Sequence, residues 1–573
     1  MPNIRSFLLI ALAFVAFLLW QAWQTDYAQP PVAATGVATQ DSAAQIPSDA
    51  DADSVPGATD IPGPAPDAPV APAPPAPMSD TAAAAAESDA PHVIVDTDVL
   101  RVEIDTQGGS VVRAWLLTYP IDPKRRDEPV VLLDNTPAHY VVAQSGLVSA
   151  NGPAPDHRAR YESPQRKYRL AEGAPAVEVP LVWHGENGLT VTKRFRFERG
   201  SYAIAVNHVI ENGSGAPWSG SVYRQLQRSA PPPAGKFSFT NPEQYSFVGA
   251  AWFSPEEHFE KLKFDDFADE PLKREITGGW SALLQHYFFA AWLPPAMEKA
   301  QYSTEVIAAP TGPRYLIRQV APAVSVAPGA KASLDSRLYV GPKLQEHVGT
   351  IAPGLESVID YGKVTVLAEP LFWLLNQLHK LLGNWGFAII ALTFLIKLAF
   401  YKLSEAQYRS MARMRKLQPR LAALKERYGD DKQKMNQAMM ELYQKEKINP
   451  FGGCLPILVQ IPVFIALYWV LIESVELRQA PFILWIDNLS DKDPYFVLPV
   501  LNGLAMWAAQ KLSPAAGMDP MQQKVMQLMP IMFAVMFAFF PAGLVLYWTV
   551  NGVLGLLQQW IITKRVQGST AKA

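Results

Sequence analysis

The chain has 573 residues, 49% of them hydrophobic, and a formal net charge of −3 at pH 7. Its single cysteine, Cys454, excludes an intrachain disulfide framework and a cysteine-based metal site. Charge is distributed unevenly: Thr25 to Leu100 holds twelve acidic residues and no Lys or Arg, whereas Lys402 to Lys447 holds twelve basic and six acidic residues. Because this basic block lies between apolar segments, it indicates a cytoplasmic loop of a membrane protein rather than a nucleic-acid-binding surface.

The N-terminal region combines a charged start with an apolar run. Arg5 precedes an uninterrupted apolar stretch from Phe7 to Trp20. A cleavable signal peptide has this pattern too, but no small-residue cleavage site follows directly. We therefore predict a signal-anchor span at residues 4–23, with the N-terminus in the cytoplasm. Residues 24–91 are rich in Ala, Pro and Asp, a composition that predicts a disordered periplasmic linker.

Residues 92–345 change to short segments that alternate polar and apolar residues. Examples are HVIVDTDVLRVEID, LTVTKRFRFERG and YAIAVNHVIEN, separated by Gly, Pro and Asn turns. Many short strands at close spacing predict a large antiparallel β-sandwich, on the periplasmic side because it follows an N-in anchor. Seven of the nine His residues lie here, yet no spacing among them predicts a metal site or a catalytic triad. Trp residues in this region fit either core packing or a sugar- or peptide-binding cleft; core packing is the default.

The next segments predict entry into a membrane. Residues 364–382 repeat Leu at intervals of three and four, the pattern of an amphipathic helix in the membrane interface, with a buried globular helix as the alternative. From Trp385 to Leu403 the chain is apolar except for Thr393, Lys397 and Lys402, and residues 384–403 predict the second span. A lysine inside a span costs about 2.5–3.5 kcal/mol even on translocon scales. Lys397 must therefore either snorkel to the interface or lie in a polar cavity.

Residues 404–449 predict a basic cytoplasmic hairpin of two antiparallel amphipathic helices. Met411 and Met414 lie on the apolar face of the first helix, and Met435 and Met439 on that of the second. Methionines at these positions fit simple packing, the commoner case, or a surface that accepts varied apolar partners.

The remaining segments complete a six-span topology. We predict spans at 453–473, 494–511, 524–540 and 543–562, a periplasmic loop at 474–493 and a basic cytoplasmic tail at 563–573. Gln460 lies in the third span, and Tyr547, Trp548, Thr549 and Asn551 lie in the sixth. No Asp or Glu lies deep in any predicted span, so Lys397 has no obvious counter-ion. This favours a water-filled cavity lined by hydroxyls and amides over a structural ion pair.

Four segments closely resemble the YidC/Oxa/Alb family of membrane protein insertases. They are SEAQYRSMARMRKLQPRLAALKERYGDDKQKMNQAMMELYQKEKINPFGGCLPILVQIPVF, ESVELRQAPFILWIDNLSDKDPYF, DPMQQKVMQLMP and FPAGLVLYWTVN. The resemblance covers about residues 365–562. The anchor, acidic linker and β-rich region match the Gram-negative architecture in order and size.

This resemblance implies a five-helix insertase core that encloses a hydrophilic groove, open to the cytoplasm and to lipid, and a periplasmic supersandwich. It implies that Lys397 takes the position of the groove cation, commonly Arg in the family, and that Thr393, Gln460, Tyr547, Trp548 and Asn551 belong to the groove. Met411, Met414, Arg415, Met435 and Met439 would belong to a substrate-receiving hairpin. Trp548 stands where the family often has Tyr.

The implied function is insertion and folding of inner-membrane proteins, alone or with the Sec translocon. The implied partners are nascent membrane proteins, the phospholipid membrane and, weakly, the ribosome through the hairpin and the basic tail. No nucleic acid, cofactor or metal is expected, and the chain is not expected to be an enzyme; no P-loop motif is present.

Two other functions remain open from the residues alone. The first is an anion or solute transporter that uses Lys397, although no repeat of broken spans supports it. The second is an anchored periplasmic glycan-binding protein whose activity resides in residues 92–345.

Overall fold

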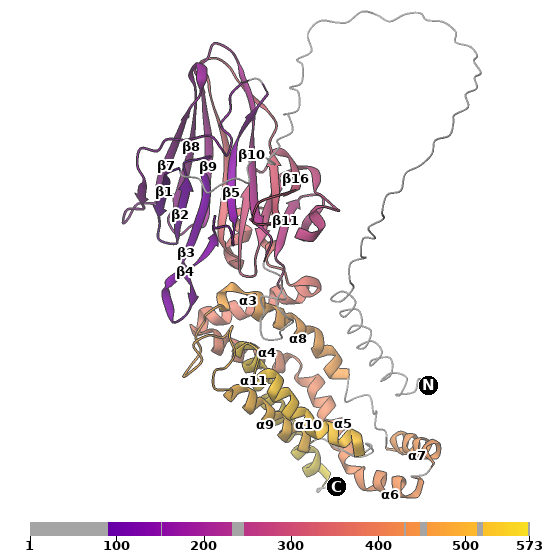
Figure 1. Cartoon of the computed structure of the whole chain (residues 1–573). Helices are drawn as coiled ribbons and strands as arrows, with labels where there is room; N and C mark the ends of the chain where they lie inside the picture. Colours follow the sequence, from indigo (N-terminus) through magenta and orange to yellow (C-terminus); the bar gives the residue numbers. More distant parts are fainter. Residues whose placement is uncertain are drawn as a thin grey trace, which may run out of the picture. The chain divides into compact units, whose positions relative to one another are not determined.

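The computed structural model describes residues 90–150, 152–231, 246–428, 431–446, 455–512 and 520–570. The predicted signal-anchor span and nearly all of the predicted linker lie outside these residues. The described chain contains a β-rich part followed by a helical part (Figure 1). This order agrees with the change from period-two to helical patterns in the sequence.

The β-rich part forms two sheets. Neighbouring strands pair antiparallel except β1 and β6, which are parallel. The larger sheet, including two branches, contains β1 (His92–Asp96), β2 (Leu100–Asp105), β3 (Ser110–Asp122), β4 (Arg125–Leu133), β5 (Val141–Ser149), β6 (Lys167–Arg169), β10 (Trp218–Ser229), β13 (Lys273–Thr277), β16 (Lys299–Ile307), β17 (Arg314–Val320) and β18 (Val324–Val326). The second sheet contains β7 (Ala176–His184), β8 (Leu189–Glu198), β9 (Ala203–Asn212), β11 (Gly249–Ser254), β12 (His258–Leu262), β14 (Trp280–Leu284), β15 (Phe288–Leu293) and β19 (Lys331–Pro342).

The predicted alternation of burial is confirmed in these strands. In β8 and β9, every second residue is buried against the other sheet. The two sheets share a continuous hydrophobic cluster that includes Trp252, Trp280 and Trp292. These three tryptophans therefore pack in the core, as the default interpretation expected.

The alternation also buries polar residues between the sheets. Lys193 of β8 and His208 of β9 are paired across the ladder and both are fully buried. The Lys193 ammonium donates to the carbonyl oxygens of Gly108 at 3.1 Å and Ser145 at 2.9 Å. Burial lowers the pKa of Lys193 to about 7.

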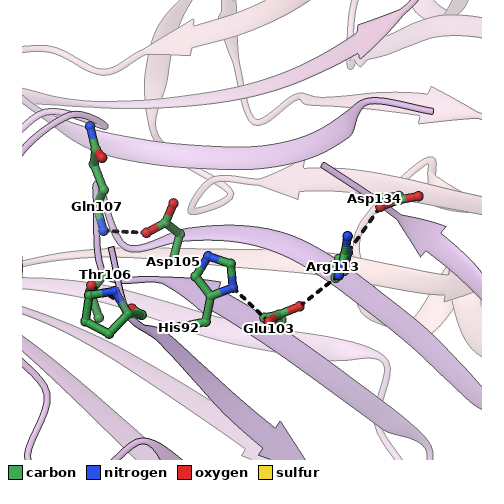
Figure 2. A network of polar contacts seen from close by, with 8 residues as sticks. His92, Glu103, Asp105, Thr106, Gln107, Arg113 and Asp134 are labelled. Atoms are coloured by element: carbon green, nitrogen blue, oxygen red, sulfur yellow. Dashed lines mark hydrogen bonds and ion pairs between the residues drawn. The ribbon is translucent and has the colours of Figure 1, made fainter. Parts of the chain in front are cut away.

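Polar side chains of the larger sheet also pair with one another. In Figure 2, Nδ1 of His92 lies 2.8 Å from the Glu103 carboxylate, and Arg113 bridges Glu103 and Asp134. No group of three or more His, Cys, Asp or Glu in the described chain has the geometry of a metal site. This network is accounted for by strand-to-strand pairing across the sheet.

The helical part follows β19. It contains α2 (Gln345–Ile351), α3 (Thr365–Leu382), α4 (Trp385–Ala399), α5 (Tyr401–Lys416), α6 (Gln418–Tyr428), α7 (Lys432–Lys445), α8 (Leu455–Glu473), α9 (Val497–Leu512), α10 (Pro520–Phe537) and α11 (Ala542–Thr570). By length and composition, Ala542–Arg565 is long and apolar enough to cross a membrane, and the bent pair Trp385–Ala399 with Tyr401–Met414 is a second candidate.

A sharp bend ends the helix that carries Lys397. The axes of α4 and α5 differ by 68°, with Phe400 between them. The sequence expectation of one span over 384–403 does not include this bend, because the apolar pattern continues through it. Tyr401 and Lys402 consequently begin the next helix, and Lys397 lies one turn before the bend.

The cytoplasmic hairpin expectation differs from the structure in one respect. The first predicted arm is divided at Leu417 into α5 and α6, and α6 lies beside α7 (Figure 1). Leu417 and Leu421 are buried there, with Met414, Met439, Leu442 and Tyr443 packed against them. Met411 and Met435 are half-buried outside this cluster, and the Arg415 side chain lies outside the described residues.

Candidate functional site

The structure buries Lys397 at the wall of a cavity of about 200 Å³. Lys397 is only 8% exposed, although it lies one turn from the helix end. The cavity is lined by Ile396, Lys397, Gln460, Ile461, Val463, Phe464, Tyr547, Trp548 and Asn551. The geometry therefore favours the cavity interpretation of Lys397 over snorkelling, in which the ammonium would reach the exposed end of the helix.

Three helices bring the polar lining together. Lys397 comes from α4, Gln460 from α8, and Asn551 from α11. Within α11, Trp548 and Asn551 are three residues apart and so share one helical face. Residues far apart in sequence thus surround the lysine with an amide from each of two other helices.

Lys397 has no ion-pair partner among the described residues. Lys402, five residues later, differs in both respects: its side chain is 92% exposed and its ammonium lies 3.8 Å from the Glu405 carboxylate. A buried cation without an anion is unfavourable, because an apolar environment solvates charge poorly. The cavity therefore has a physical preference for an incoming acidic group.

A hydrophobic cluster closes one end of this arrangement. Ala388, Ile389 and Leu392 of α4 pack with Ala466 and Leu467 of α8, all fully buried. The same cluster includes Leu477, Ala480, Ile486 and Leu489 from the segment between α8 and α9. On α4 the cluster residues precede Lys397, and on α8 they follow Gln460. The polar cavity therefore ends where this packed layer begins.

A second cavity of about 380 Å³, which is still more apolar, adjoins the Lys397 cavity. Its lining is Phe464, Ile465, Tyr468, Met536, Phe537, Phe540, Leu544 and Trp548. Phe464 and Trp548 line both cavities, and their rings meet edge to face at 4.6 Å between centroids. The Nε1 atom of Trp548 is buried without a hydrogen-bond partner in the described chain. Lys397 and the Trp548 indole, neither with a partner among the described residues, therefore lie on the walls of these adjoining cavities.

Five of the six groove residues expected from the sequence line the polar cavity, and Thr393 does not. Thr393 is fully buried, and its hydroxyl donates to the carbonyl oxygen of Ile389 at 2.7 Å. A threonine in a helix commonly bonds the carbonyl four residues earlier, which satisfies the hydroxyl inside its own helix. Thr393 and Lys397 lie on the same helical face, but only Lys397 lines the cavity.

Sequence reasoning missed Phe464 and Gly555. Phe464 lies four residues after Gln460 on α8, so helical spacing placed it near the polar face. Gly555 lies four residues after Asn551 on α11, and the Lys397 ammonium is 3.5 Å from the point where its Cβ would be. Both positions follow the same helical rule as the residues that were identified.

Comparison with known proteins matches nearly the whole described chain. A family profile for the YidC periplasmic domain matches residues 92–374, and one for the 60 kDa inner membrane protein matches residues 377–570. The membrane protein insertase YidC of Thioalkalivibrio sulfidiphilus (strain HL-EbGR7) is 50% identical over 579 residues and covers 100% of both chains. The chain belongs to the YidC family.

The membrane protein insertase YidC of Nitrosococcus oceani (strain ATCC 19707) is 47% identical over 568 residues, covering 99% of both chains. Among solved structures, an active YidC insertase with its first transmembrane domain resolved is 17% identical and covers 82% of this chain and 92% of its own, with a TM-score of 0.37. As a YidC family member, the chain is a bacterial inner-membrane protein, and residues 92–374 correspond to the periplasmic domain of the family. The Lys397 cavity lies within the second matched region.

Proposed function

We propose that this protein inserts other proteins into the bacterial inner membrane and assists their folding there. The observation that carries the proposal is the buried Lys397 ammonium, which faces a cavity and has no acidic partner among the described residues. The relatives named as membrane protein insertases support the same function. The protein acts without an enzymatic reaction of its own.

The proposed path begins with an acidic segment of the substrate. Lys397 attracts this segment into the polar cavity, where Gln460 and Asn551 offer amide groups to its backbone. The cavity shortens the apolar layer that a hydrophilic segment must cross, which lowers the free energy of crossing. The apolar span of the substrate then moves past Phe464 and Trp548 into lipid, driven by burial of about twenty apolar residues.

The proposed topology has six spans. The signal anchor would be the first span, α4 the second, and α8, α9, α10 and α11 the third to sixth, with both termini in the cytoplasm. Under this topology the hydrophobic cluster around Leu392 closes the groove on the periplasmic side, and α5, α6 and α7 are cytoplasmic. The basic loop and the exposed Lys564 and Arg565 support this orientation, because positive residues favour the cytoplasmic face.

The proposed partners follow from this path. Nascent membrane proteins would meet the hairpin of α6 and α7 first, where Met414 and Met439 supply adaptable apolar surface. The ribosome would approach the same hairpin and the basic end of α11, and the Sec translocon would pass on larger substrates. The periplasmic part would take the two-sheet form of a supersandwich beside this machinery.

The decisive experiment replaces Lys397 with Glu, Ala and Arg in full-length protein produced in a depletion strain. Protease protection of a short substrate with an acidic tail measures insertion. We expect Lys397→Arg to insert the substrate and Lys397→Glu to fail, because a carboxylate repels the tail. Lys402→Glu is the matched control, since its exposed side chain should change insertion little. Normal insertion by Lys397→Glu would contradict the proposal.

A further inference from the structure

Two polar side-chain atoms lie beside one glycine of α11. A Cβ atom built on Gly555 would lie 3.3 Å from the Tyr408 hydroxyl oxygen and 3.5 Å from the Lys397 ammonium nitrogen. These atoms come from α5 and α4, on opposite sides of the bend at Phe400. The middle of α5 therefore lies near the lysine despite the bend, and both side chains end at the same backbone position.

Neither atom has a partner within the described part of the chain. No hydrogen bond or ion pair joins Lys397 or Tyr408 to another described residue, and Lys397 is 8% exposed. An ammonium has three donors and a phenol has one, so hydrogen-bonding capacity remains unused. A ligand that accepts hydrogen bonds from both groups would use this capacity.

The ligand chemistry that fits both atoms is a carboxylate. It can accept one hydrogen bond from the ammonium and a second from the hydroxyl through its two oxygens. A Cβ at residue 555 would crowd the hydroxyl, since 3.3 Å is tighter than most Cβ contacts. The absence of a side chain at this position leaves both donors free to approach the same group.

We propose that Tyr408 and Lys397 together form the receiving site for a substrate carboxylate, and that Gly555 keeps this site open. This inference rests on the function proposed above and assigns that site a second donor and a positioning residue. Tyr408 lies on the helix that follows the bend, which is cytoplasmic in the proposed topology. An acidic tail arriving from the cytoplasm would therefore reach the hydroxyl and the ammonium at one place.

The test measures insertion of two substrates that differ only in their N-terminal tails, one carrying Asp and the other Asn at the same positions. Full-length Tyr408→Phe is produced in a depletion strain, and protease protection gives the ratio of acidic-tail to neutral-tail insertion rates. We expect this ratio to fall about three- to tenfold, the effect of one net hydrogen bond, with neutral-tail insertion unchanged. Gly555→Ala should lower the ratio in the same direction by a smaller factor.

Two controls separate the carboxylate contact from effects on folding. Tyr443→Phe removes a hydroxyl from the hairpin cluster, and Gly552→Ala adds a methyl group whose nearest neighbours would be 3.6 and 3.7 Å away. Both should leave the ratio unchanged. If Tyr408→Phe lowers insertion of both substrates equally, or changes neither, the receiving-site inference is wrong.

Lys397→Glu is measured in the same assay. If it abolishes acidic-tail insertion while Tyr408→Phe leaves the ratio unchanged, the proposed function stands and only the role of Tyr408 is lost. If Lys397→Glu inserts both substrates normally, the proposed function itself fails. The two failures therefore give different results.

Discussion

The Ser246 hydroxyl donates a hydrogen bond of 3.0 Å to the Glu473 carboxylate, which joins the β-rich part to the last residue of α8. His286 reinforces this connection: its Nε2 atom lies 3.1 Å from the carbonyl oxygen of Ile472. Next to them, the Gln345 backbone N–H donates to the Glu476 carboxylate at 2.9 Å. The end of α8 is therefore held by buried polar contacts that also involve charged groups.

Replacing Glu473 with Gln should destabilise the protein. Lys343 is fully buried, and its pKa is lowered to about 8 by burial, an effect that the Glu473 carboxylate partly offsets. Without that carboxylate the buried ammonium loses a favourable electrostatic interaction, so the free energy of unfolding should fall. Thermal unfolding in detergent should show a lower Tm, and adding Lys343→Met should restore part of the loss. An unchanged Tm in Glu473→Gln would show that the two charges do not interact.

Gly386→Ala should be destabilising, whereas Gly552→Ala should be tolerated. A Cβ on Gly386 of α4 would lie 1.9 Å from Cδ2 of Phe482, so the Phe482 ring in the loop that follows α8 would have to move. Overpacking of this kind costs about 1–3 kcal/mol. On Gly552 the added methyl would make ordinary contacts at 3.6 Å and beyond. Thermal melts of both variants give the comparison, and equal Tm values would contradict the packing argument.

Asp493→Ala should loosen the start of α9. The Asp493 carboxylate accepts hydrogen bonds from the backbone N–H of Leu498 at 2.8 Å and of Tyr495 at 3.1 Å, and from the Trp485 indole at 2.9 Å. Loss of a helix cap costs about 0.5–2 kcal/mol, and the partly buried indole donor of Trp485 adds to the loss. Hydrogen exchange at the first turn of α9 should accelerate. Asp493→Asn, which retains one oxygen acceptor, should lie between Ala and the parent protein.

The buried Lys193 should make the free energy of unfolding depend on pH, and Lys193→Met should remove this dependence. Burial lowers the pKa of Lys193 to about 7, below its usual value in an unfolded chain. Between these two values the unfolded state binds more protons, so stability should rise with pH, by at most about 1.4 kcal/mol per pH unit. Urea unfolding from pH 7 to 10 should therefore show a steeper increase in the parent protein than in Lys193→Met. Parallel curves for the two proteins would mean that the lysine is not deprotonated in the folded state.

The sequence by itself determined the local elements. Period-two alternation identified strands such as β8 and β9, and apolar runs identified α4 and α11. This was possible because the spacing of apolar residues in the sequence follows the buried face of each element. The same reasoning singled out Lys397, since a charge within an apolar run is costly wherever the run is placed. Gln460 and Asn551 were identified in the same way, as polar groups inside apolar segments.

Only the tertiary structure decided which of these side chains meet. Thr393 shares a face with Lys397 but bonds Ile389 of its own helix, whereas Tyr408, from the next helix, lies with the lysine beside Gly555. The difference arises at Phe400, where the chain bends although no Pro or Gly lies at the bend. Periodicity records which face of one helix is apolar, but it carries no information on how that helix turns relative to the next. The convergence of Lys397, Tyr408 and Gly555 depends on that turn and on the packing of α11.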